Sequence, residues 1–63
     1  MFRVVLRGRL SDRFASAFEG MKLEPGAGKT TLVGSLDQAQ LWGILERVRE
    51  FGFELIRVEE VLE

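Results

Sequence analysis

A chain of 63 residues without a cysteine or a histidine has to fold on side-chain packing alone or with the help of a partner subunit. Domains below about 70–80 residues usually add a disulfide, a bound metal or self-association, because their cores supply only a few kcal/mol. The residues that most often supply the first two are absent. We therefore expect a single domain over residues 1–63 that packs unusually well or forms a homodimer, without a metal or a cofactor.

Composition is that of a folded domain. Hydrophobic residues make up 46% of the chain, charged residues make up 30%, and the net charge is −1. These values exclude a disordered acidic or basic tail. No apolar run approaches the ~20 residues of a membrane span, and arginines interrupt the short apolar start, which argues against a signal peptide. We expect a cytoplasmic protein without a membrane anchor.

Apolar residues recur at two different spacings. An apolar residue at every second position is typical of a half-buried strand, whereas apolar residues three and four positions apart are typical of one helix face. The first pattern predicts strands over residues 2–9, 21–24, 29–36 and 53–61, and the second predicts helices over residues 11–20 and 37–51.

Residues that start and stop helices support these predictions. Ser11 is a good N-cap for the first helix, which Gly20 stops. Asp37 and Gln40 form a predicted capping box for the second helix, and Gly52 is placed for a left-handed C-cap. The order βαββαβ is the ferredoxin-like α+β arrangement, a four-stranded antiparallel sheet with two helices on one face.

The second predicted helix and the last strand contain a longer pattern, Asp37-Gln38-Ala39-x-Leu41-x-Gly43-x-Leu45-x-Arg47-x-Arg49-x-x-Gly52-x-x-Leu55-x-x-Val58. It resembles a stretch found in many short bacterial proteins of unassigned function and covers residues 37–58, about a third of the chain. The resemblance implies a bacterial domain with the ferredoxin-like layout. It implies no activity and no catalytic residue.

The turn Pro25-Gly26-Ala27-Gly28-Lys29-Thr30 resembles the end of a P-loop, in which backbone amides and a lysine bind phosphate. The first glycine of that motif is missing, because its position is Leu23. A P-loop also needs a large parallel sheet that this chain is too short to build. The sequence therefore favours a glycine-rich hairpin turn, while a weak anion site at Gly26, Gly28 and Lys29 stays open.

Basic residues recur along the first predicted strand, where Arg3, Arg7 and Arg9 are expected on one side of the sheet. A basic sheet face can bind nucleic acid. RNA-binding sheets of this topology stack bases on strand aromatics, however, and the strand over 29–36 has none. Carboxylates of the last strand can pair with these arginines, so we favour a charge-compensated surface that faces water or a subunit.

No set of catalytic residues is recognisable. Glu59 and Glu60 are neighbours in a strand and point to opposite faces, whereas Glu46 and Glu50 face water, where nothing shifts a pKa. The serines lack a histidine to activate them. We do not expect an enzyme.

Trp42 lies beside the apolar stripe of the second helix and not at its centre. Packing against the edge of the core is the favoured interpretation, and exposure at a contact between subunits is the alternative.

These observations favour a non-enzymatic interaction or regulatory module that binds another protein and acts as a homodimer. It would associate through the open face of the sheet or through an exposed edge strand. Nucleic-acid binding by the arginine-bearing face is the alternative function. The residues of the expected interaction surface are Arg3, Val5, Arg7, Arg9, Trp42 and Arg57.

Overall fold

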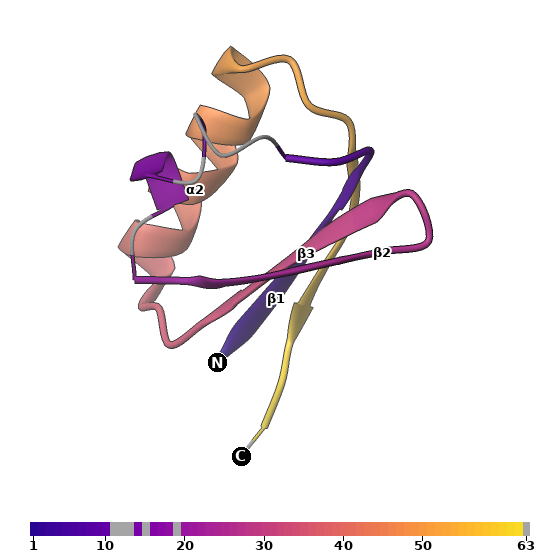
Figure 1. Ribbon diagram of the computed structural model, residues 1–63. Coiled ribbons are helices and arrows are strands. Elements are labelled where there is room, and N and C mark those ends of the chain that lie inside the picture. Colours follow the sequence, from indigo (N-terminus) through magenta and orange to yellow (C-terminus); the bar gives the residue numbers. More distant parts are fainter. Residues whose placement is uncertain (11–13, 15, 19, 63) are drawn as a thin grey trace.

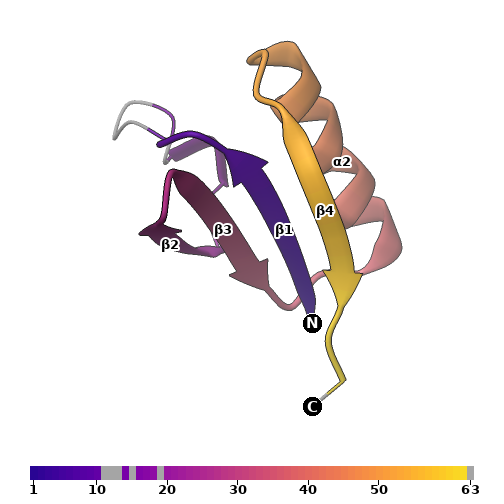
Figure 2. The same cartoon turned by 90° about the vertical axis from the view of Figure 1, so that its right-hand side faces the viewer.

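The computed structural model describes residues 1–10, 14, 16–18 and 20–62. Four strands form one antiparallel sheet in the order β2-β3-β1-β4, so that β2 and β4 are its edges. Helix α2 lies against one face of this sheet, behind β4 in the view of Figure 2 (Figures 1 and 2). The elements are β1 (Phe2–Arg7), a 3₁₀ turn (Ser16–Phe18), β2 (Lys22–Gly26), β3 (Lys29–Gly34), α2 (Gln38–Glu50) and β4 (Leu55–Glu60).

The prediction of a ferredoxin-like βαββαβ fold with two helices is wrong. In the described part of the chain the sheet has one α-helix, α2, and the segment between β1 and β2 contains the 3₁₀ turn Ser16–Phe18. Much of the predicted first helix, at positions 11–13, 15 and 19, lies outside the described residues. A helix of barely two turns gains few hydrogen bonds against its nucleation cost, so its caps alone are weak support. The chain is a small α+β protein.

The core lies between the sheet and α2. Strands β1 and β3 alternate, and their side chains on the helix side are buried. The helix contributes residues at the predicted three and four residue spacing, and the turn before β2 adds Phe18. The core residues are Val4, Leu6, Phe18, Met21, Leu32, Leu41, Ile44 and Val48.

Both ends of α2 have the caps that the sequence predicts. The Asp37 side chain accepts a hydrogen bond from the Gln40 backbone N–H at 2.7 Å, and the Gln40 side chain accepts one from the Asp37 backbone at 2.9 Å. At the other end, Gly52 has φ +79°, and Phe53 donates its N–H to Val48. This is a Schellman motif, which turns the chain toward β4. No helix in the described ranges is long and apolar enough to span a bilayer.

The turn between β2 and β3 has two residues, Ala27 and Gly28, with φ of +53° and +72°. Two successive positive φ angles define a type I′ turn, which matches the twist of a hairpin and favours glycine or asparagine at both positions. Ala27 is the only non-glycine residue with positive φ in the described part of the chain. Its Cβ is strained there.

We expect Ala27→Gly to raise the free energy of unfolding by up to about 1 kcal/mol, since glycine adopts positive φ without steric cost. Chemical denaturation monitored by circular dichroism measures this change. The control is Ala39→Gly in α2, where the same substitution at a helical φ should lower stability by about 1 kcal/mol. Equal effects of the two substitutions would contradict the assigned turn.

Candidate protein interface

The face of the sheet opposite α2 contains most of the predicted arginine surface. Cross-strand pairing places Arg57 opposite Val5 and Glu59 opposite Arg3. Arg3 and Arg57 both lie 3.5 Å from the Glu59 carboxylate. Arg7 donates to Glu54 at 2.7 Å. The strand residues on this face include no aromatic side chain, and their charges are largely paired, which leaves little potential to attract phosphate.

Val5, a residue of the expected interaction surface, is already covered within the single chain. It lies on the open face but is only 6% exposed. Its cross-strand neighbours are Thr31 and Arg57, and long arginine side chains can cover an apolar neighbour with their aliphatic parts. Docking of a partner onto this face would therefore bury little additional apolar surface.

Two other residues of the predicted surface lie elsewhere. Arg9 is exposed in the loop after β1, beyond Gly8 with φ +89°. Trp42 lies on α2, on the other side of the sheet, and is 63% exposed. This exposure favours the alternative interpretation of Trp42, a side chain available for contact, over packing at the edge of the core. The six predicted residues do not form one surface.

The glycine-rich segment is a hairpin and is followed by strand β3, not by a helix. Thr30 is 2% exposed and its hydroxyl is fully engaged. It donates to the Gly8 carbonyl at 2.9 Å and accepts from the Leu10 N–H at 3.1 Å. The threonine of the P-loop-like sequence thus holds the loop after β1 against the hairpin, which is a structural role.

The outer edge of β4 offers unpaired backbone groups. In an antiparallel pair, alternate residues direct their N–H and C=O groups to the same neighbour. The Val61 N–H donates to the Met1 carbonyl at 2.8 Å. Glu59 and Arg57 precede Val61 at every second position, so their backbone N–H and C=O groups also face β1. Val58 and Glu60 therefore direct their backbone groups away from the sheet. These groups can pair with another strand.

The opposite edge, β2, is less suited to pairing. The two-residue turn makes Gly26 and Lys29 a hydrogen-bonded pair, so that Leu23 and Pro25 face outward. Pro25 has no N–H to donate. Proline at this place blocks strand addition, as it does at the edges of many natural sheets. The two edges of the sheet thus differ in what they can bind.

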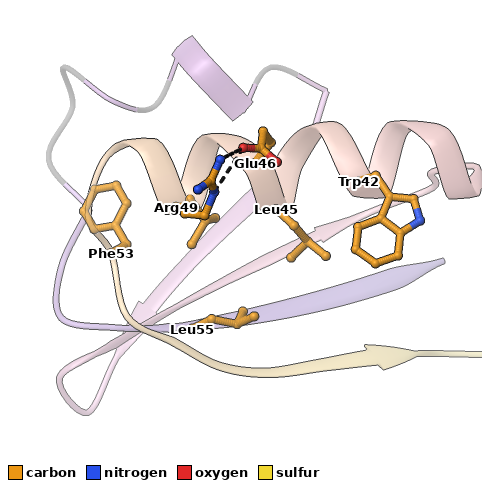
Figure 3. A pocket seen from close by; sticks show the side chains of 7 residues that line it. Trp42, Leu45, Glu46, Arg49, Phe53 and Leu55 are labelled. Carbon is orange, nitrogen blue, oxygen red and sulfur yellow. Dashed lines mark hydrogen bonds and ion pairs between the residues drawn. The ribbon is translucent and has the colours of Figure 1, made fainter.

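A groove of about 420 Å³ runs between α2 and β4, beside the open edge. Figure 3 shows Trp42 and Leu45 pointing from the helix toward the strands, with Leu55 below Arg49 and Phe53 at the end opposite Trp42. Leu55 is 44% exposed. The lining is mostly apolar, so the groove can receive apolar side chains of a bound chain. We refer to it as the α2–β4 groove.

A charged pair forms the rim of this groove. Arg49 donates to Glu46 from two guanidinium nitrogens, one of them at 3.0 Å. The hydrogen bond and the negative charge of Glu46 raise the pKa of the Arg49 guanidinium above its ordinary value. The Arg49 guanidinium therefore keeps its positive charge on this rim.

Sequence reasoning missed the groove because a β-bulge creates part of it. The register of β4 against β1 shifts between Val5 and Leu6, and Leu55 pairs with Leu6, a core residue. Simple alternation from Val58 would place Leu55 on the open face. The signals that were available are Trp42 and Leu55 themselves, two large apolar residues close to the ends of adjacent elements.

No three acidic, histidine or cysteine side chains among the described residues lie close enough to hold a metal ion. A mostly apolar groove beside unpaired backbone groups is suited to binding a polypeptide.

The model of a family described as Domain of unknown function (DUF8691) matches residues 1–59. No curated protein and no solved structure matches the chain.

Proposed function

The chain belongs to the family described as Domain of unknown function (DUF8691), and from its geometry we propose that it is a non-enzymatic module that binds another polypeptide by adding a strand to β4. The observation that carries this proposal is the open edge of β4 next to the α2–β4 groove. In strand addition, backbone hydrogen bonds supply affinity, and pockets for alternate side chains supply specificity.

Each half of the site contributes one part of this recognition. The outward backbone groups of Val58 and Glu60 bond to the added strand. The side chains of that strand on the helix side then enter the groove, where Trp42 and Leu55 lose their exposed surface. Exposed tryptophan is a frequent hot spot in protein interfaces. We place the module in the cytoplasm, because a chain without cysteine suits a reducing compartment.

Photo-crosslinking tests this function without knowledge of the partner. A benzophenone amino acid replaces Trp42 in the full chain, and cells that express it are irradiated. We expect crosslinks to polypeptide that decrease by about tenfold when Glu60→Pro is added, since proline removes an outward N–H and obstructs the approaching strand.

The control for this experiment is Glu60→Ala, which removes the same charge but keeps the N–H and should keep the crosslinks. The backbone N–H of Glu60 points away from β1 and the residue is exposed, so neither substitution removes a hydrogen bond to β1. Circular dichroism checks that both variants are folded. Crosslinks that are absent, or that persist equally in the proline variant, would contradict strand addition at β4.

A further inference from the structure

We infer that the strand added to β4 is the β4 of a second copy of the chain, in antiparallel orientation, with Val58 opposite Val58 across the two-fold axis. This inference rests on the proposed function and names the partner of that site. It follows from the order of charges along β4, from the direction of its free backbone groups and from the geometry of antiparallel pairs.

In an antiparallel pair of two β4 strands, the outward backbone groups of Val58 can bond to Ile56, Val58 or Glu60 of the second copy. These three registers are centred on Arg57, Val58 and Glu59. A register centred on Arg57 places the two Arg57 side chains opposite each other, and a register centred on Glu59 does the same for two glutamates. Like charges directly opposite are destabilising. The register centred on Val58 instead places Arg57 opposite Glu59 of the other copy, and symmetry produces this favourable pair twice.

The pairing also agrees with the two faces of the strand. Residues directly opposite each other in an antiparallel pair share a face. Arg57 and Glu59 lie on the open face, where Glu59 is already 3.5 Å from both Arg3 and Arg57. Arg57 of the second copy would extend this group of charges. Val58 lies on the helix side and packs against the core, so the two Val58 side chains meet beside it.

The chemistry of β4 therefore selects its own copy among extended chains. A strand that runs antiparallel to Arg57-Val58-Glu59 needs, in its own direction, a basic, an apolar and an acidic residue. That order is the order of β4 itself. The dimer would also supply the self-association that a chain of this length without disulfides is expected to need.

Disulfide trapping tests the register, because the natural chain has no cysteine. Arg57→Cys and Glu59→Cys are prepared as separate proteins, mixed and oxidised gently. The two positions face each other in a non-hydrogen-bonded pair, with Cα atoms about 4.5 Å apart, which a disulfide can bridge. We expect the mixed dimer to exceed either self-linked dimer by about tenfold, since like positions lie diagonally at about 7–8 Å.

Sedimentation equilibrium of the natural protein accompanies the trapping, and we expect a dimer at high micromolar concentration. A dimer whose disulfides link like positions would overturn the register. A monomer at that concentration, with no mixed disulfide, would overturn the second copy as the partner. In either case the crosslinks from position 42 show separately whether the edge of β4 binds a polypeptide, so failure of this inference is distinguishable from failure of the proposed function.

Discussion

Replacing Leu32 with alanine is expected to lower the free energy of unfolding by about 2–5 kcal/mol. Leu32 is fully buried in β3 and lies between Val4 of β1 and Leu23 of β2. Truncation removes its packing and leaves a cavity that the sheet cannot close. A domain of this length has a total stability of only about 3–9 kcal/mol, so the loss is a large part of it.

Urea denaturation followed by circular dichroism measures the effect of Leu32→Ala. The matched control is Val33→Ala, the next residue of the same strand, which is half-buried on the opposite face. Its loss should be about 1 kcal/mol. If the two variants were equally stable, the core would not lie between the sheet and α2.

The second large effect is expected at Thr30. Thr30→Val keeps the shape of the side chain but removes the hydroxyl that binds both Gly8 and Leu10. One part-buried backbone acceptor, the Gly8 carbonyl, and one part-buried donor, the Leu10 N–H, lose their partner, and a fully buried unsatisfied group costs about 1–3 kcal/mol. We expect a loss of about 2–4 kcal/mol in the free energy of unfolding, because water satisfies part of what the loop exposes.

Thr31→Val is the control for Thr30→Val, since Thr31 lies next to it on the open face and no side-chain hydrogen bond to it is present among the described residues. It should change stability by less than about 0.5 kcal/mol. Amide hydrogen exchange adds a local measurement: the Leu10 N–H should exchange faster in the Thr30 variant. Unchanged exchange at Leu10 would show that the hydroxyl does not hold this loop.

The strand ends, the caps of α2 and the hairpin turn were predictable, because each depends on residues that are close together in the sequence. The predicted ends of all four strands lie within two residues of the observed ends, and the capping box of Asp37 and the C-cap at Gly52 are confirmed. These features depend on residues close together in the chain. The hairpin turn is confirmed for the same reason, although Ala27 does not have the residue type that its φ favours.

Features that depend on distant contacts were not predictable. The bulge in the pairing of β4 with β1 moves Leu55 to the helix side, and alternation along a single strand cannot reveal it. The burial of Val5 depends on side chains from neighbouring strands. The prediction of a helix over residues 11–20 fails at Ser16–Phe18, which form a 3₁₀ turn, because apolar residues three and four positions apart fit either an α-helix or a 3₁₀ turn.

Pro25 lies at the outer side of β2, and it would limit the growth of the inferred dimer through β4 into longer assemblies. A sheet with two equivalent free edges can recruit chain after chain and form a fibre. Here Pro25 obstructs one edge, so the inferred dimer through β4 would present only the proline-bearing strands at its ends. Its growth would then stop at two chains. Substitution of Pro25 would restore an N–H group on this edge and so favour the addition of further chains.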